Sequence, residues 1–527
     1  MAGKGLDITK VGMLGVGSMG SMISLLLAEL GIEVFYYDPN TKNLDTLEQQ
    51  SKTIKLDSKL HRSTDYTEIC QNLDSPSSHD DQQPKVFLFS TPHGAPADAC
   101  VEGLKPHLRP GDVIIDCGNE HWTNTERRQR DLDPRGVHYV GCGVSGGYQS
   151  ARHGPSMSPG GSPEALSLVL PFLEKMAARD QRGRPCVVPV GPGGSGHYVK
   201  MVHNGIEQGM MSVVAEVWML LTTGLGLSHE EVGAVFEDWN RSGPLHDSFL
   251  VDIGARIERA KGKGKKKKAE GEQQQQQQQE IDRVRDKVTQ DVTEEEGTGI
   301  WTCEQAVALH VPAASILSAH LFRCASADLA RRIQNRKAAS GGGVEPRPLS
   351  PSVVASKQDF VELLHKTTYF CFLACFAQGL DVIRAKDRRE GWDLDYVALL
   401  QLWRGGCIIQ ADHIADVLEG VFRRADHDRD EVLGNAEVER ELAERFPAAK
   451  EAVLRAVEAD FFVPAVSQTL EWYKYATSAH LPTQFMEAQL DYFGQHMFDD
   501  AWEDPVGGPE KGRRHFEWQP ARGVSGK

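Results

Sequence analysis

Two kinds of apolar pattern alternate along the N-terminal part of the chain. Short apolar runs predict strands at 11–14, 32–37, 85–90, 112–117 and 137–140. Stretches with helical spacing lie between them, at 19–30, 95–104 and 124–131. Because strands that alternate with helices pair in parallel, this pattern predicts a doubly wound α/β sheet.

The pattern changes after about Ser195, where strand signals stop and long helical patterns begin. Helices are predicted at 360–384, 395–402, 408–422 and 461–476. The expected fold is therefore α/β and then all-α, with a doubly wound sheet, a large helical domain and a C-terminal tail. We place the domains at 1–194, 195–478 and 479–527.

Polar segments of low complexity interrupt this pattern and are typical of solvated insertions. Residues 261–280 hold a Gly/Lys run and seven glutamines, and 73–84 and 340–348 are shorter polar insertions. The charged residues of about 424–459 predict a pair of added surface helices. Residues 426–430 have the acidic spacing of a calcium loop, but Glu431 stands where that loop needs glycine, so no metal site is predicted.

A glycine motif joins the first predicted strand to the first predicted helix. It is a G-x-G-x-x-G motif made of Gly15, Val16, Gly17, Ser18, Met19 and Gly20. Glycines in this setting let the backbone approach a pyrophosphate, which the helix N-terminus then stabilises. We therefore expect a Rossmann-type dinucleotide-binding domain, with these six residues at the cofactor.

Asp38 follows the second predicted strand and bears on the choice of cofactor. A carboxylate at this place can accept hydrogen bonds from a ribose 2′-hydroxyl, which favours NAD, and it repels the 2′-phosphate of NADP. Lys42 lies within reach of such a phosphate, so NADP stays open. The alternative interpretation of Asp38 is a turn or N-cap residue before the next helix.

Four polar residues lie at helical spacing in an otherwise apolar run. Lys200, His203, Asn204 and Glu207 have offsets of three, four and seven, so they share one face of a helix. A lysine and a carboxylate on one face can serve as a base and an acid for the same small substrate. The alternative is the solvent-exposed face of an amphipathic helix.

Several longer runs carry a more specific signal, at 111–119, 143–147, 196–207, 236–240, 297–299, 403–409 and 491–494. They resemble runs of 6-phosphogluconate dehydrogenases, in the wider β-hydroxyacid dehydrogenase family. The similarity extends from about Val11 to Phe498, interrupted by insertions. Their number and order favour common descent over chance.

The resemblance implies a role for each residue of the site. Lys200, with its pKa lowered by burial, would take the proton of a secondary alcohol while hydride leaves for the nicotinamide. After carbon dioxide is lost, Glu207 would protonate the enediol. Asn119 would lie between substrate and cofactor. The remaining expected substrate ligands are Ser145, Gly146, Gly147, His203 and Asn204.

The sequence departs from the family where the substrate phosphate is bound. Gln208 stands in place of a tyrosine, Glu296 in place of a lysine and Leu490 in place of an arginine. Arg323 is retained, and His496 matches the family histidine that enters the neighbouring subunit of a homodimer. Losing such charge-assisted hydrogen bonds should cost roughly 1.5–3 kcal/mol each.

Two further departures concern the cofactor and the neighbouring loop. Asp38-Pro39-Asn40 replaces the Asn-Arg-Thr that binds the NADP phosphate, and Glu120 replaces the serine after Asn119. The expected activity is oxidative decarboxylation of 6-phosphogluconate or a related sugar acid with NADP or NAD. The alternatives are an NAD-dependent dehydrogenase of a non-phosphorylated β-hydroxy acid and a non-catalytic relative with a structural or regulatory role.

Composition indicates where such a protein would work. The 527 residues carry a net charge of −16, which argues against partners such as nucleic acid or an anionic membrane surface. The ten cysteines are scattered and favour free thiols in a reducing compartment. No run of about 18 apolar residues is present, so we expect no transmembrane helix and a cytoplasmic protein.

Overall fold

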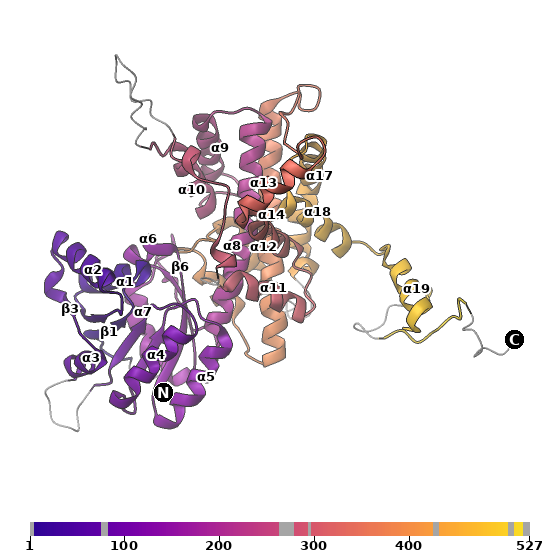
Figure 1. Cartoon of the computed structure of the whole chain (residues 1–527). Helices are drawn as coiled ribbons and strands as arrows, with labels where there is room; N and C mark the ends of the chain where they lie inside the picture. The colour runs from indigo at the N-terminus through magenta and orange to yellow at the C-terminus, as the bar shows by residue number, and fades with distance from the viewer. Residues whose placement is uncertain are drawn as a thin grey trace, which may run out of the picture. The chain divides into compact units, whose positions relative to one another are not determined.

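The protein is described by a computed structural model that covers residues 5–74, 83–262, 279–293, 297–424, 432–503 and 511–519 (Figure 1). The chain divides into two compact units, Met1–Leu470 and Glu471–Lys527. Most of the insertion at 261–280, the acidic segment 426–430 and Glu296 lie outside the described residues.

The N-terminal part of the first unit is a seven-stranded sheet. Its strands are β1 Lys10–Leu14, β2 Glu33–Tyr37, β3 Leu60–Arg62, β4 Val86–Phe89, β5 Val113–Asp116, β6 His138–Ser145 and β7 Ser156–Gly160. Their order is β3-β2-β1-β4-β5-β6-β7, and all neighbours pair in parallel except β6 and β7. The predicted doubly wound sheet is confirmed, with two strands, β3 and β7, that the apolar pattern missed.

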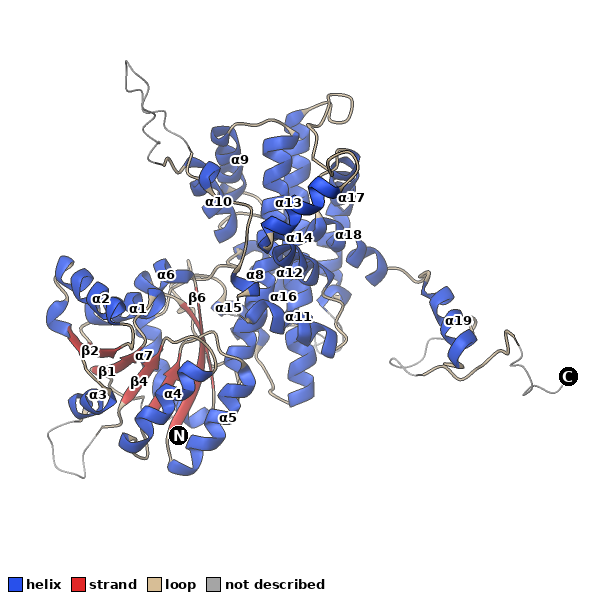
Figure 2. Ribbon diagram, in the orientation of Figure 1, coloured by secondary structure: helices blue, strands red, loops and turns tan. Residues whose placement is uncertain are grey.

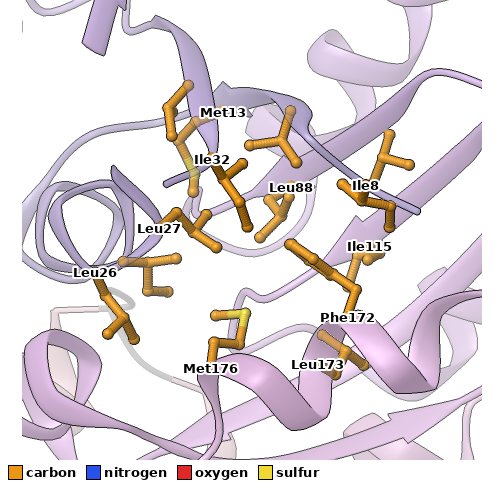
Figure 3. Close-up of a cluster of buried hydrophobic side chains, with 14 of the residues drawn as sticks. Ile8, Met13, Leu26, Leu27, Ile32, Leu88, Ile115, Phe172, Leu173 and Met176 are labelled. Atoms are coloured by element: carbon orange, nitrogen blue, oxygen red, sulfur yellow. The ribbon is translucent and has the colours of Figure 1, made fainter. Parts of the chain in front are cut away.

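Helices cover both faces of the sheet (Figure 2). They are α1 Ser18–Glu29, α2 Thr41–Thr53, α3 Tyr66–Leu73, α4 Ala95–Leu104, α5 Trp122–Leu132, α6 Gly147–His153 and α7 Pro163–Met176. Side chains that follow one another along a strand enter different cores, because successive residues point to opposite faces. Met13 and Ile115 pack with Phe172 of α7 (Figure 3), whereas Leu14 and Ile114 pack on the other face.

The order of the strands predicts a ligand crevice beside the glycine motif. The chain runs outward from β1 to β3 and then returns to β4 on the other side of β1. At such a switch point the loops after the two central strands separate, and ligands bind there in open α/β sheets. The loops that follow β1, β4 and β5 therefore form the rim of the expected cofactor site.

Helices make up the rest of the first unit (Figure 1). They are α8 Ser195–Met219, α9 His229–Arg241, α10 Phe249–Arg259, α11 Thr298–Ala308, α12 Ala314–Ala327, α13 Leu329–Ala338, α14 Lys357–Glu390, α15 Tyr396–Leu402, α16 Asp412–Phe422 and α17 Ala436–Glu458. Helix α18 Pro464–Ala476 begins in this unit and ends beyond Leu470. The predicted change from α/β to all-α is thus confirmed. The boundary at 194/195 stays a prediction, because both parts lie within one compact unit.

Helix α14 is long and apolar enough to cross a membrane by length and composition. Most of its apolar stretch is buried inside the protein, as in the core helix of a globular fold. Polar residues such as Thr367, Thr368 and Gln378 interrupt the apolar run, so the sequence pattern did not predict a membrane span here.

The predicted pair of charged surface helices is wrong, because the described part of that segment forms the single helix α17. Its buried residues Val438, Leu442, Ala449 and Ala452 keep one helical stripe on both sides of Pro447, so packing continues the helix past the proline. The helix predicted from 408 begins instead at Asp412.

The second unit contains α19 Thr483–Gly494 and is organised around one buried carboxylate. Asp491 is fully buried and accepts hydrogen bonds from the backbone of Met497 and Phe516, from the Trp518 indole and from His515. These hydrogen bonds hold the pKa of Asp491 below its usual value, against the effect of burial. The same unit exposes a row of large apolar side chains on α19.

Glu216 of α8 predicts an unusual dependence of stability on pH. Its carboxylate accepts hydrogen bonds from Ser212 and from the backbone of Ala465 and Val466, yet burial raises its pKa to about 7. The folded state holds this proton more tightly than the unfolded state does. The free energy of unfolding of the protein should therefore fall by about 3 kcal/mol as pH rises from 4.5 to 7.

The variant Glu216→Gln removes this titration. Urea unfolding at pH 5 and pH 8 should show a smaller loss of stability in the variant than in the wild-type protein. An equal loss in both proteins would contradict a raised pKa of Glu216.

Candidate active site

The glycine motif has the geometry of a pyrophosphate cradle. Gly15 has φ +89°, and a Cβ there would lie 2.4 Å from the carbonyl oxygen of Ser90. A Cβ on Gly20 would lie 2.1 Å from the carbonyl oxygen of Gly15, so this glycine lets α1 approach β1. Gly17 faces open space and leaves the N-terminus of α1 without a side-chain cap. The loop therefore fits a dinucleotide phosphate bound at the helix N-terminus.

Asp38 is buried and braces this loop. Its carboxylate accepts hydrogen bonds from the backbone N–H of Val16 at 2.9 Å, from that of Asn40 at 2.8 Å and from the Asn43 amide at 3.0 Å. Asn40 in turn caps α2 by accepting from the backbone N–H of Lys42. The structure thus gives Asp38 the turn role of the alternative interpretation. It also fixes a negative charge at the end of β2, beside the cradle.

The loops after β4 and β5 are clamped together by Glu120 and a buried arginine. Glu120 accepts hydrogen bonds from the backbone N–H of Gly94 at 2.8 Å and from Arg128 at 2.7 Å. Arg128 also donates to the carbonyl oxygen of Gly94 at 2.9 Å. Burial opposes ionisation of Glu120, but the hydrogen bonds from Asn124 and Gly94 and the charge of Arg128 hold its pKa below the usual value. Glu120, which stands where the family resemblance leads us to expect a serine, is thus a carboxylate that pairs with Arg128 and joins the two loops.

The polar stripe of α8 is buried, which decides between its two interpretations. Lys200 is 7% exposed, His203 1% and Asn204 9%. A solvent-exposed helix face would leave these side chains in water. Burying a lysine costs free energy that its hydrogen bonds must offset. The buried polar face therefore favours the interpretation as a site over that of a solvent-exposed helix face.

Lys200, His203 and Asn204 form one hydrogen-bonded group. The Lys200 ammonium donates to Asn204 Oδ1 at 2.7 Å and lies 3.3 Å from His203 Nδ1. Burial and the neighbouring positive charge of Lys200 lower the pKa of His203 well below its usual value, so its ring is neutral. Glu207 Oε2 lies 3.8 Å from His203 Nδ1, which places the predicted acid beside the neutral histidine of this group.

The loop after β6 reaches the same group. Ser145 Oγ lies 2.9 Å from His203 Nε2, and Cys407 Sγ lies 3.0 Å from the same nitrogen. Gly146 and Gly147 follow with φ values of +102° and +67°, which turn the chain into α6. Burial raises the pKa of the Cys407 thiol to about 12, so this group stays a neutral hydrogen-bonding neighbour.

The distal end of the stripe contacts α11 and α12. Asn204 Nδ2 donates to Thr298 Oγ1 at 3.0 Å, at the first residue of α11. Gln208 is buried, and its Oε1 lies 3.2 Å from His320 Nδ1 on α12. Arg323 lies one turn further along α12 and is partly buried. The carboxamide that replaces the family tyrosine therefore has a side-chain partner.

The remaining predicted residues are placed less fully. Asn119 follows β5 in the clamped loop and is partly exposed, at the rim of the crevice. His496 and Leu490 belong to the second unit and are exposed there. Their role in a site shared between two chains stays a prediction, as does any effect of Glu296.

Sequence reasoning missed three residues that hold the site together, Arg128, Thr298 and Cys407. Thr298 and Cys407 stood in runs that match the family, but no spacing tied them to the α8 stripe. Arg128 stands beside Arg127, and the sequence does not distinguish the two. Only burial distinguishes them, because the side chain of Arg128 is 2% exposed and that of Arg127 is 51% exposed.

The fold and this geometry define a nicotinamide-dependent dehydrogenase class. Residues 10–191 match the NAD binding domain of 6-phosphogluconate dehydrogenase, and residues 196–518 match the 6-phosphogluconate dehydrogenase C-terminal domain. The chain therefore belongs to the 6-phosphogluconate dehydrogenase family, as the resemblance implied. It spans both family domains.

Full-length relatives support this assignment. The decarboxylating 6-phosphogluconate dehydrogenase of Emericella nidulans is 41% identical over 96% of this chain and 100% of its own length. The NADP(+)-dependent, decarboxylating enzyme of Bacillus subtilis is 32% identical over 97% of this chain and 99% of its own. The structure of Plasmodium falciparum 6-phosphogluconate dehydrogenase superposes with a TM-score of 0.81 at 27% identity, covering 97% of this chain and 100% of that one.

The clamp predicts different effects for two adjacent arginines. Arg128→Met should destabilise the protein by about 3–5 kcal/mol, because it leaves the buried carboxylates of Glu120 and Asp116 unpaired. Arg127→Met removes an exposed ion pair with Asp98 and should cost less than about 1 kcal/mol. Urea unfolding of both variants measures the difference. Equal effects would show that the buried network does not hold the loops.

Proposed function

We propose that this protein catalyses the oxidative decarboxylation of 6-phosphogluconate with NADP or NAD, as in the pentose phosphate pathway. The observation that carries the proposal is the buried face of α8. It places a lysine, a neutral histidine, an amide and a carboxylate together beside the loop after β6. The family membership of both domains supports the same reaction.

Lys200 and Glu207 would divide the proton transfers. Lys200 would first release its ammonium proton to solvent and then, as a neutral amine, take the proton of the substrate hydroxyl, while Asn204 and His203 keep the amine in place. A nicotinamide cofactor held at the glycine loop would supply the acceptor for the hydride that leaves the carbon bearing this hydroxyl. The resulting β-keto acid loses carbon dioxide, with Lys200 returning its proton to the carbonyl oxygen. Glu207 would then protonate the carbon that the carboxylate has left, while the enediol hydroxyl returns its proton to Lys200, which gives a ketopentose phosphate.

The loop after β6 would bind the substrate carboxylate. Ser145 Oγ accepts the backbone N–H of Ile408 at 3.4 Å and contacts His203, so its position is set from two sides. Gly146 and Gly147 lack side chains, so their backbone can approach an anion closely. Asn119, at the end of β5, would lie between substrate and cofactor.

Three residues would bind the distal end of the sugar acid. Arg323 supplies a cation, and Gln208, held by His320, supplies a carboxamide where relatives of this family have a tyrosine. His496 of a second copy would complete the site. Because of these replacements, we expect this site to bind the substrate phosphate more weakly than the sites of other family members do.

For the cofactor we propose NAD as the better partner, with NADP as the alternative. The buried carboxylate of Asp38 is fixed by three hydrogen bonds, so it cannot swing away from an incoming 2′-phosphate without breaking them. Two ribose hydroxyls are donors and carry no charge, and they suit a carboxylate better than a phosphate does.

We infer a homodimer built with the C-terminal unit. Helix α19 exposes Phe485 and Phe493, each at 71%, together with Met486 at 60% and Tyr492 at 55%. With Leu490 and Trp518 these side chains line an apolar hollow within the second unit. A second copy of this chain would cover that surface, because an apolar patch of this kind marks an interaction site.

We also keep the predicted domain boundaries, with the dinucleotide at 1–194, the substrate and dimer helices at 195–478 and a tail at 479–527. A cytoplasmic location suits the cysteines, all ten of which lie in described residues. No disulfide joins them.

The activity is tested by reduced-nicotinamide absorbance with 6-phosphogluconate and gluconate, each with NAD and with NADP. We expect turnover of 6-phosphogluconate, one carbon dioxide released per reduced nicotinamide, and a higher kcat/KM with NAD. Turnover of gluconate alone would support the non-phosphorylated alternative. No turnover with any pair would support the non-catalytic relative.

The variant Lys200→Met should lower kcat by about 10²–10⁴-fold, because it removes the base while keeping much of the side-chain volume. Lys366→Met is the matched control, since Lys366 is an exposed lysine on α14 paired with Glu362. Its kcat should equal that of the wild-type protein. A Lys200→Met variant with normal kcat would exclude Lys200 as the base.

The dimer is tested by charge placed on α19. Phe485→Glu with Phe493→Glu should shift the sedimentation coefficient from dimer to monomer and lower activity, because an ionised carboxylate resists burial in an apolar contact. Gln484→Glu adds a charge at a polar, exposed position of the same helix and should leave the dimer intact. A wild-type protein that sediments as a monomer would overturn the inference.

A further inference from the structure

Trp301 of α11 touches both cofactor-side loops. Its ring lies edge to face with His93, at a centroid distance of 5.1 Å and an angle of 82°. It lies in the same way against His121, at 4.9 Å and 85°. His93 belongs to the loop after β4, and His121 to the loop after β5. One indole therefore connects a helix of the substrate side to two loops at the crevice.

The two histidines form a firm platform. His93 precedes Gly94 and His121 follows Glu120, so both stand on the clamp that Glu120 and Arg128 make. The His121 ring also stacks on Trp122 at 3.8 Å, with 25° between the planes. Burial lowers the pKa of His121, with His93 and Lys386 acting in the same sense and Glu120 opposing them. The ring that meets Trp301 is thus a neutral aromatic surface.

The position of the indole is set by a glycine. A Cβ on Gly297 would lie 2.1 Å from Trp301 Cζ2 and 2.3 Å from Trp301 Cε2. The φ of Gly297 is −105°, which any residue adopts, so the backbone does not require glycine there. The space around Gly297 does require glycine, because the Trp301 indole folds back over the start of α11.

The same turn of α11 is fixed to the catalytic helix. Thr298 Oγ1 accepts from Asn204 Nδ2 at 3.0 Å, and Asn204 accepts from Lys200. Thr302, beside Trp301, donates to the carbonyl oxygen of Met201 at 2.9 Å. The contacts thus run from the loop of Asn119 through Trp301 to the group that contains Lys200.

We propose that Trp301 is a positioning residue that sets the distance between the nicotinamide, held by the loops after β4 and β5, and the substrate, held by α8. This inference rests on the proposed function. Hydride transfer is sensitive to such a distance, since a displacement of about 1 Å can cost about 10²-fold in rate. Trp301 touches neither reacting atom and acts through Thr298, His93 and His121.

The test compares Trp301→Ala with Trp239→Ala. Trp239 makes a similar contact with His365 at 5.4 Å, between α9 and α14, which carry none of the proposed site residues. We expect Trp301→Ala to lower kcat by about 10-fold or more, with KM for substrate and cofactor within about 3-fold. The primary isotope effect with substrate deuterated at the oxidised carbon should rise. Trp239→Ala should change neither.

Two further variants separate positioning from folding. Trp301→Phe keeps an aromatic edge and should recover most of kcat, whereas Gly297→Ala displaces the indole and should reproduce the rise in isotope effect. Normal kcat and isotope effect in Trp301→Ala would overturn the proposal. So would equal losses in Trp301→Ala and Trp239→Ala.

A readout that does not need turnover keeps this test distinct from that of the proposed function. Amide hydrogen exchange at 91–94 and 119–122 should accelerate in Trp301→Ala and not in Trp239→Ala. Unchanged exchange would show that Trp301 does not hold the loops of His93 and His121, even if the wild-type protein proved inactive on 6-phosphogluconate. Accelerated exchange in an inactive protein would support the contact and leave the reaction as the failed part.

Discussion

The burial of one lysine governs the architecture of the site. An ammonium group among apolar helices is tolerated where hydrogen-bond acceptors surround it, and Asn204 and His203 supply them from the same face of α8. Those two partners need partners of their own, which come from Thr298, Ser145 and Cys407. Satisfying Lys200 thus recruits α11, the end of β6 and the turn before α16. The helical part and the sheet are held together around this group.

The sequence was sufficient for the parts that depend on local spacing. The glycine motif at Gly15, the short apolar run that ends before Asp38 and the helical spacing that begins at Lys200 can each be read from neighbouring residues. Contacts between distant segments could not be predicted in this way. Cys407 reaches Ser145 across 262 positions, and no local pattern records that approach. Strand β3 has only three residues, too few to show an alternation.

Two departures from the family acquire a physical meaning in the structure. Glu120 is neutralised by Arg128 inside the clamp, and Gln208 is held by His320. Each of these buried polar groups thus has a side-chain partner, as burial requires. Asp38 differs from these two, because its three hydrogen bonds brace the glycine loop and fix a carboxylate beside the expected cofactor site.

The contact between Ser145 and Cys407 has a consequence for biosynthesis. Residue 407 is synthesised long after the sheet, so a chain in mid-synthesis already has the glycine loop while its substrate pocket still lacks Cys407. His203 then lacks one of its neighbours, and the lysine group is not yet closed. The nascent domain could therefore hold dinucleotide without being able to reduce it, and chemistry would begin only when the last helices fold onto α8.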